Sequence, residues 1–193
     1  FPGIDLFGKA FHDAGFCVVK AGDINLDGSD IRDFHVPPNK FDGIIGGSPC
    51  QDFSKLNRNK KSYGFEMLRQ YQRVVVEASP DWYLFENVIG VPEFEIKGYT
   101  NQRFTLDLAW FTPFSRLRVF QFGAKNGTWL NPMIGVRREI IETAVTGSDT
   151  RSFSAMCEIQ GLPKTFDLPF LSLQGKKKAV GNGVPMQLGK YLA

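Results

Sequence analysis

Cysteine is scarce in this chain of 193 residues, which contains only Cys17, Cys50 and Cys157. The three lie far apart and show no spacing typical of a metal site, so we predict no bound metal. An odd and sparse set also argues against a disulfide framework and indicates a reducing compartment. No apolar run approaches the length of a membrane span and no signal peptide is visible, which predicts no membrane partner.

Excess charge is also lacking, since 23 Lys and Arg against 20 Asp and Glu leave a net charge of only +3. Any surface that binds nucleic acid must therefore be local. Hydrophobic residues make up 42% and charged residues 22%, as in a soluble globular protein. The chain is long enough for one α/β domain, and its 18 phenylalanines predict a core rich in aromatic packing.

One of the three cysteines follows a short apolar stretch that ends abruptly. Residues 41–45 predict a strand, which Gly46, Gly47 and Pro49 terminate just before Cys50. Polar residues follow at once, so we expect the thiol in a surface turn at the carboxyl end of the strand. Open α/β sheets place their chemistry there. A packed, inert thiol is the alternative interpretation.

A carboxylate follows a second apolar strand. Residues 82–85 predict a buried strand after a helix at 66–78, and Glu86 comes directly after the strand. Apolar surroundings raise the pKa of a carboxyl group and favour the protonated form, which can donate a hydrogen bond. A helix cap or a turn residue is the alternative. If both strands belong to one sheet, Cys50 and Glu86 lie at the same edge.

Residues 1–23 show the order of a nucleotide-type cofactor site. A turn at Gly3 precedes a predicted helix at 9–15 and a predicted strand at 16–19, and Asp23 follows. Glycine lets a ligand approach the backbone, and a carboxylate after the second strand accepts hydrogen bonds from ribose hydroxyls. Asp30 is predicted to cap a helix.

The remaining chain predicts further elements without an internal repeat. A basic loop at 55–63 follows Cys50 and either contacts phosphates or is simply solvated, and the same two readings apply to Arg137-Arg138 and Lys176 to Lys178. We predict strands at 104–110 and 119–123 and helices at 139–143, 151–162 and 186–193.

A cysteine and an acid at one edge of a sheet suit an attack on a pyrimidine. The C5 atom of cytosine is a poor nucleophile, but addition of a thiolate to C6 gives an enamine-like ring with electron density at C5. A group that protonates N3 stabilises the charge that develops, and C5 can then attack a methyl donor. Cys50 and Glu86 would supply the thiolate and the acid.

With these residues in this order, the chain resembles the DNA (cytosine-5)-methyltransferase family, in a short form like those of phage and bacterial genomes. The resemblance spans nearly the whole chain. Its motifs are Phe1-x-Gly3, Pro49-Cys50-Gln51, Glu86-Asn87-Val88, Arg116-Leu117-Arg118, Gln160-Gly161-Leu162-Pro163 and Gly181-Asn182-Gly183-Val184-Pro185.

The resemblance implies an α/β, Rossmann-like S-adenosylmethionine-dependent methyltransferase fold, with a mostly parallel seven-stranded sheet and helices on both faces. Residues 1–123 would form the catalytic and cofactor-binding core, 124–150 a reduced target-recognition region, and 151–193 a C-terminal segment that completes the catalytic domain. The partner would be double-stranded DNA with a flipped base, in the cytoplasm of a bacterial or phage-infected cell.

The resemblance also implies roles for single residues. Cys50 would be the nucleophile, Glu86 would contact N3 and the exocyclic amine, and Arg118 would contact the base O2 with Arg116 positioning the site. The cofactor S-adenosyl-L-methionine would be bound by Phe1, Gly3, Asp5, Asp23, Ile24, Asp30, Ile31, Pro49, Asn182 and Val184.

The chain departs from the family pattern at several positions. Asp5 and Leu6 stand where paired glycines are usual, and Phe114 replaces the usual Gln. The region between Gly123 and Arg151 is short, so the target is read with little protein, with a separate specificity partner, or with residues that this sequence does not include. Two alternatives stay open: methylation of transfer RNA, by analogy with a branch of the family, and a catalytically weak DNA-binding or regulatory homologue.

Overall fold

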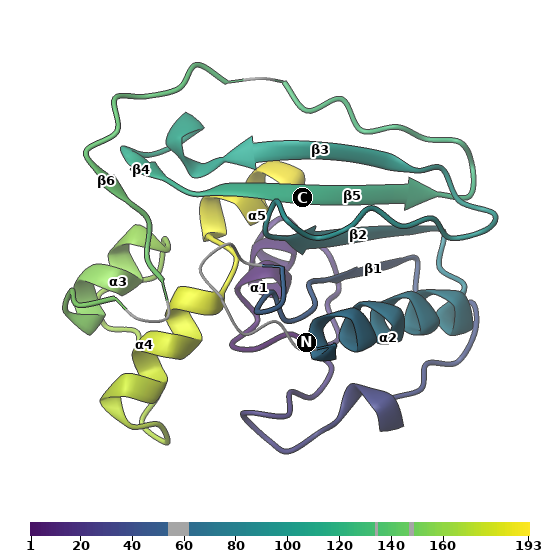
Figure 1. Cartoon of the computed structure of the whole chain (residues 1–193), viewed down its shortest axis with the longest axis horizontal. Coiled ribbons are helices and arrows are strands. Elements are labelled where there is room, and N and C mark those ends of the chain that lie inside the picture. The colour runs from purple at the N-terminus through teal and green to yellow at the C-terminus, as the bar shows by residue number, and fades with distance from the viewer. Residues whose placement is uncertain (54–61, 134, 147–148) are drawn as a thin grey trace. The chain divides into compact units, whose positions relative to one another are not determined.

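The computed structural model describes residues 1–53, 62–133, 135–146 and 149–193 (Figure 1). The chain divides into two compact units, each assembled from segments that are separated in sequence. Unit 1 consists of Phe1, residues 21–106 and residues 117–133. Unit 2 consists of residues 2–20, 107–116 and 134–193.

A four-stranded sheet with the strand order β1-β2-β5-β3 forms the centre of unit 1. Strands β1 and β2 are parallel, with Gly46 opposite Phe85, whereas β2 and β5 are antiparallel, with Glu86 opposite Phe120. The arrows of β3 and β5 point in opposite directions in Figure 1. The strands are β1 (Gly43–Gly46), β2 (Trp82–Asn87), β3 (Gln102–Asp107) and β5 (Leu117–Ala124).

The sheet is mixed, so the prediction of a mostly parallel sheet is wrong, and the count of seven strands is not confirmed by the described residues. Only residues 108–116 separate β3 from β5, which is shorter than the dozen or so residues that a parallel crossover needs. The strand predicted at 16–19 is also wrong. Phe16 and Val19 are 41% and 68% exposed, so neither is buried as in a core strand, although the ring of Phe16 contacts that of Phe11.

Helix α2 (Tyr63–Ala78) packs its apolar stripe against this sheet and begins three residues before the predicted helix. Its buried residues Leu68, Tyr71 and Val75 share one cluster with Phe85 of β2. The ring centroids of Tyr71 and Phe85 lie 4.8 Å apart, and the ring of Phe94 packs edge-on 5.2 Å from Phe85. The predicted aromatic core is confirmed, and each such ring stabilises the fold by about 1.5–3 kcal/mol through burial.

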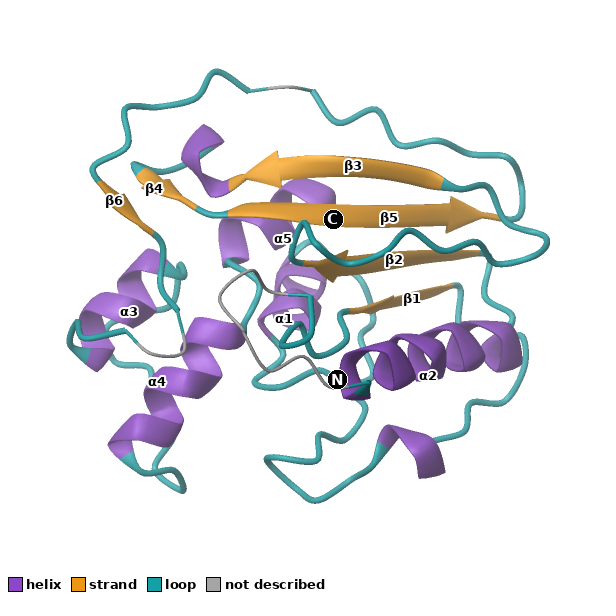
Figure 2. Cartoon of the chain, viewed as in Figure 1, coloured by secondary structure: helices purple, strands orange, loops and turns teal. Residues whose placement is uncertain are grey.

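Unit 2 is largely helical (Figure 2). Helices α1 and α5 pack so closely that a Cβ atom on Gly189 would lie 2.5 Å from the Cβ of Ala10. Helices α3 and α4 lie side by side, and β4 pairs with β6 in parallel. The elements are α1 (Leu6–Asp13), η2 (Leu108–Trp110), β4 (Phe114–Ser115), β6 (Glu142–Thr143), α3 (Phe153–Ile159), α4 (Leu173–Asn182) and α5 (Met186–Leu192).

The helix predicted at 139–143 is wrong, because this segment is extended and Ile141 is 73% exposed, so no apolar stripe is buried. Helix α4 was not predicted, because Gly181, Asn182 and Gly183 are typical of a turn. Ser172 caps this helix by accepting from the Gly175 N–H. Among the helices of the described residues, none combines the length and apolar character needed to cross a membrane.

Candidate active site

The chain segments that leave β1 and β2 run beside each other. Beyond the paired residues Gly46 and Phe85, Gly47 lies next to Glu86 and Ser48 next to Asn87. The Asn87 side chain donates hydrogen bonds to the carbonyl oxygen and the hydroxyl of Ser48, at 2.9 and 3.2 Å. A Cβ atom on Gly47 would lie 3.1 Å from the Oε2 atom of Glu86. The predicted nucleophile and acid therefore come from neighbouring strand ends.

Cys50 forms no disulfide and is half-buried in a turn, as the sequence predicted. The Phe53 N–H donates to the Cys50 carbonyl oxygen at 3.0 Å and closes the turn. The other two cysteines differ, since Cys17 is exposed and Cys157 is buried. Of the three thiols, Cys50 is the one at the carboxyl end of a sheet strand.

Glu86 lies within β2, one residue before its end, rather than directly after the strand. Its side chain is 13% exposed, and the Nε atom of Arg118 lies 3.1 Å from its Oε1 atom. Arg118 comes from β5, the neighbour of β2 in the sheet. The apolar surroundings predicted for Glu86 therefore include a cation.

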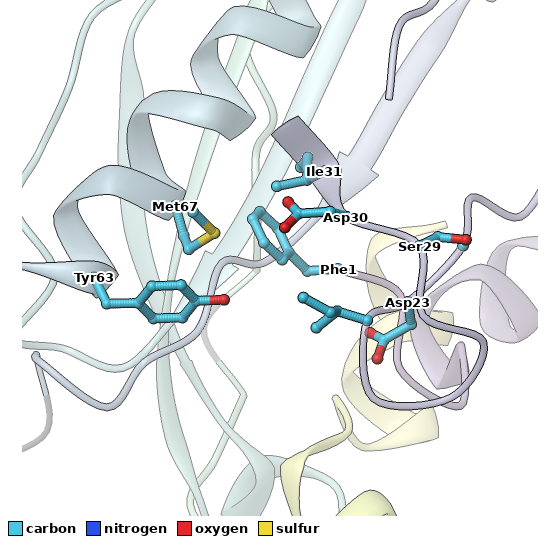
Figure 3. Close-up of a pocket in the computed structure, with 9 residues that line it drawn as sticks. Phe1, Asp23, Ser29, Asp30, Ile31, Tyr63 and Met67 are labelled. Atoms are coloured by element: carbon cyan, nitrogen blue, oxygen red, sulfur yellow. The ribbon is translucent and has the colours of Figure 1, made fainter. Parts of the chain in front are cut away.

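A pocket in unit 1 contains half of the residues predicted to bind the cofactor. Figure 3 shows Tyr63 and Met67 projecting from α2 toward the ring of Phe1, with Asp23 and Asp30 on the other side of that ring. Sequence analysis missed Tyr63 and Met67, whose only signal is their place in the first turns of the helix that follows Cys50. The lining consists of Phe1, Gly22, Asp23, Ile24, Ser29, Asp30, Ile31, Tyr63 and Met67.

The pocket combines an aromatic ring and apolar side chains with carboxylates. Asp30 caps η1 (Ile31–Asp33), as predicted, by accepting from the Arg32 N–H at 2.9 Å. Hydrogen bonds from the Arg32 side chain lower the pKa of Asp30 to about 2, so this carboxylate is ionised at neutral pH. An aromatic face suits a purine and a carboxylate suits ribose hydroxyls, so the chemistry of the lining fits an adenosine group.

The other residues predicted to bind the cofactor have different local roles. Gly3 and Asp5 both adopt left-handed backbone angles, with φ of 54° and 58°. Asp5 caps α1 by accepting from the Gly8 N–H at 3.1 Å, and burial raises its pKa. The described lining of the pocket does not include Gly3, Asp5, Pro49, Asn182 or Val184.

In unit 2, side chains from two of the sequence motifs, Arg116 and Gln160, meet at the backbone of a third, at Gly183. The buried guanidinium of Arg116 donates to the carbonyl oxygens of Val145, Gly181 and Gly183, the last two at 3.1 and 3.2 Å. The buried side chain of Gln160 donates to Gly183 at 3.0 Å as well. Arg116 therefore fixes the backbone on both sides of Asn182, which is a positioning role.

Sequence analysis missed Asp107, which holds the turn that leads to Arg116. Its buried carboxylate accepts from the N–H groups of Arg116 and Ala109, at 2.8 and 3.1 Å, and pairs with Arg137 at 3.2 Å. The signal was an aspartate between a strand and a short helix, a typical cap position.

Replacing Arg116 with methionine is expected to lower the free energy of unfolding by about 2–4 kcal/mol, because buried carbonyl oxygens lose their donors. Urea unfolding measures this change. Arg138→Met, which removes an exposed side chain, is the matched control and should stay within about 0.5 kcal/mol of the unchanged protein. Equal stability of both variants would contradict the positioning role.

Two of the predicted basic clusters form ion pairs with aspartates. Arg137 pairs with Asp107, and Lys176 pairs with Asp167 at 2.5 Å. Most of the basic loop at 55–63 lies outside the described residues. Across the residues that the structure does describe, no group of three or more His, Cys, Asp and Glu side chains could hold a metal ion.

Comparison with known sequences gives a consistent result. A family model described as C-5 cytosine-specific DNA methylase matches residues 4–150. The type II methyltransferase M.AgeI of Thalassovita gelatinovora is 30% identical over 174 residues, covering 67% of this chain and 41% of the relative. M.DdeI of Desulfomicrobium norvegicum is 30% identical over 143 residues, covering 65% and 34%. The chain thus spans about two fifths or less of these relatives.

Solved structures share the fold. DNMT2 of Spodoptera frugiperda, determined as a mutant, superimposes with a TM-score of 0.70 at 16% identity, covering 100% of this chain and 96% of that chain. A putative DNA modification methyltransferase encoded in an E. coli prophage gives a TM-score of 0.68 at 16% identity, covering 100% and 95%. At this identity the likeness shows the fold alone.

Proposed function

Because the chain belongs to the C-5 cytosine-specific DNA methylase family, we propose that it transfers a methyl group from S-adenosyl-L-methionine to C5 of cytosine in double-stranded DNA. One observation supports this proposal: the parallel pairing of β1 and β2 places Gly47 and Ser48, which lead to Cys50, beside Glu86 and Asn87. The activity, the cofactor and the DNA partner of the whole protein are all part of the proposal.

In the proposed reaction, the Cys50 thiolate forms a bond to C6 of a flipped cytosine, and the electron pair of the C5–C6 double bond becomes available at C5. Glu86 contacts N3 and the exocyclic amine, and Arg118, its partner in the sheet, contacts O2. The cofactor supplies a methyl group on a positively charged sulfur. After C5 has gained the methyl group, its proton leaves and the electrons return to expel the thiolate.

The pocket of unit 1 is the proposed site for the adenosine part of the cofactor. The ring of Phe1 stacks on the adenine, Asp23 accepts from the ribose hydroxyls, and Asp30 and Ile31 contact the adenine edge. Ile24 completes the apolar wall. The same proposal keeps the predicted cofactor-binding roles of Gly3, Asp5, Pro49, Asn182 and Val184.

The division of labour along the chain also remains a proposal. Residues 1–123 carry the catalytic and cofactor-binding core, 124–150 read the DNA target with or without a specificity partner, and 151–193 complete the catalytic domain. A seven-stranded sheet with helices on both faces, a cytoplasmic location and a role in restriction-modification belong to the same proposal. Crystals with bound duplex and cofactor would test the assignment of residues 124–150.

The proposed function is tested by transfer of a tritiated methyl group from the cofactor to unmethylated duplex DNA, with transfer RNA as a second substrate. We expect 5-methylcytosine in the DNA only. Methylation confined to the RNA would show that RNA, and not DNA, is the substrate. Absence of both cofactor binding and methyl transfer would favour a regulatory homologue and would overturn the proposal.

Replacing Asp23 with asparagine is expected to weaken binding of S-adenosylhomocysteine about tenfold, because a hydrogen bond to a charged acceptor becomes one to a neutral amide. Isothermal titration calorimetry measures the dissociation constant. Asp33→Asn is the matched control, since Asp33 is exposed and does not line the pocket. An unchanged dissociation constant for Asp23→Asn would show that Asp23 does not bind the ligand.

A further inference from the structure

The turn that carries the Cys50 thiol is anchored on both sides. Ser48, two residues before Cys50, accepts hydrogen bonds from the Asn87 side chain. Asp52, two residues after it, accepts from the Gly64 N–H at 2.6 Å. The first anchor leads to the strand of Glu86, and the second leads to helix α2.

Asp52 caps α2 from outside the helix, 12 positions before its partner Gly64. The residue at the cap position, Ser62, makes no side-chain hydrogen bond to the helix. The Asp52 carboxylate, only 5% exposed, takes this place and accepts from the second residue of the helix. A negative charge is favoured at a helix N-terminus by the free N–H groups and by the helix dipole.

Only a residue without a side chain fits at position 64. A Cβ atom at position 64 would lie 2.9 Å from the Cβ of Asp52 and 3.1 Å from its Oδ2 atom. The turn that carries Cys50 and the first turn of α2 therefore touch with no room for a side chain between them.

The first two turns of α2 also form one wall of the pocket. Tyr63 directly precedes Gly64, and Met67 lies about one helical turn further on. Both side chains project toward Phe1 in Figure 3. One buried carboxylate therefore joins the thiol-bearing turn to the wall on which an adenosine would rest.

We infer that Asp52 is a positioning residue that couples occupation of the pocket to the placement of Cys50, an inference that rests on the proposed function. A ligand held between Phe1 and Tyr63 fixes the first turn of α2. The Asp52–Gly64 hydrogen bond passes this constraint to the turn that carries Cys50. The coupling is reciprocal, so a change that loosens the turn also weakens binding of the ligand.

The test compares Asp52→Ala and Asp52→Asn with the control Asp81→Ala, which removes an exposed carboxylate at the start of β2. Without ligand, iodoacetamide alkylation of Cys50 is followed by peptide mass spectrometry, with the exposed Cys17 as internal reference. We expect Asp52→Ala to accelerate alkylation of Cys50 at least about threefold relative to Cys17, since the hydrogen bond from Gly64 is lost. Asp52→Asn keeps an acceptor oxygen and should change the ratio less than about twofold.

The second measurement is calorimetric titration of the same proteins with S-adenosylhomocysteine. We expect Asp52→Ala to weaken binding about fivefold, and the ligand to slow Cys50 alkylation in the unchanged protein but not in Asp52→Ala. Normal affinity together with normal thiol reactivity in Asp52→Ala would overturn the role of Asp52. Failure of the unchanged protein to bind the ligand would instead overturn the proposed cofactor and the coupling with it, whereas the ligand-free alkylation would still decide whether Asp52 positions Cys50.

Discussion

Replacing Cys50 with serine is expected to slow methyl transfer to DNA at least about a thousandfold, because a serine hydroxyl is not ionised near neutral pH and adds poorly to C6. A cysteine thiol of ordinary pKa is already a few per cent ionised at pH 7. The substitution changes one atom of a half-buried side chain, so the fold should persist. The rate is measured as tritium transferred to duplex DNA.

Cys17→Ser is the matched control for this variant, because Cys17 also forms no disulfide but lies exposed in unit 2. Its rate of methyl transfer should stay within about twofold of the unchanged protein, as expected for an exposed position. Methyl transfer that survives in Cys50→Ser would refute attack by this thiol while leaving the family membership untouched.

Replacing Glu86 with glutamine is expected to lower the rate about a hundredfold to a thousandfold, because the amide has a similar shape but cannot exchange a proton with N3. The amide also loses the negative charge that pairs with Arg118. Single-turnover methyl transfer, with enzyme in excess over DNA, measures the chemical step. Binding of S-adenosylhomocysteine should be retained, since Glu86 does not line the pocket of unit 1.

Two further observations make the test of Glu86 specific. Glu139→Gln removes an exposed carboxylate and should leave the rate within about twofold. Alkylation of Cys50 by iodoacetamide should stay close to that of the unchanged protein, which would show that the turn is intact. Full activity of the Glu86→Gln variant would show that Glu86 is not the acid that acts on the cytosine.

Local chemistry made the centre of the site predictable from the sequence. An apolar run that ends in glycine and proline places Cys50 after a strand, and a second run places Glu86 at the end of another. Both strands end at the same edge of the sheet, because β1 and β2 are parallel neighbours. The chemical compatibility of a thiol and an acid around one pyrimidine suggested this pairing before the sheet was known.

The direction of strands was harder to predict, because apolar patterning is the same in parallel and antiparallel neighbours. The mostly parallel sheet was implied by the resemblance to the family, whereas the short connection at 108–116 makes β3 and β5 antiparallel. Residues 16–19 are apolar, as in a strand, but Phe16 and Val19 remain exposed. The apolar character of a residue alone does not determine whether its side chain becomes buried in the core.

Residues that hold the site by long-range hydrogen bonds could not be found from local patterns. Arg116 contacts Gly183, which is 67 positions further along the chain. Asp52 contacts Gly64 at a separation of 12 positions, which no local sequence motif specifies. Each looks like an ordinary polar residue in the sequence. Only the fold shows that the Asp107 carboxylate holds the backbone of Arg116.

The most direct test of the central claim uses duplex DNA in which the target cytosine carries fluorine at C5, incubated with the protein and S-adenosyl-L-methionine. Fluorine cannot leave as a proton does, so the bond between the thiol and C6 should persist after methyl transfer. We predict a covalent protein–DNA complex in which peptide mass mapping finds the base on Cys50. Methylation of ordinary cytosine without such a complex, or a complex formed through another residue, would contradict the account.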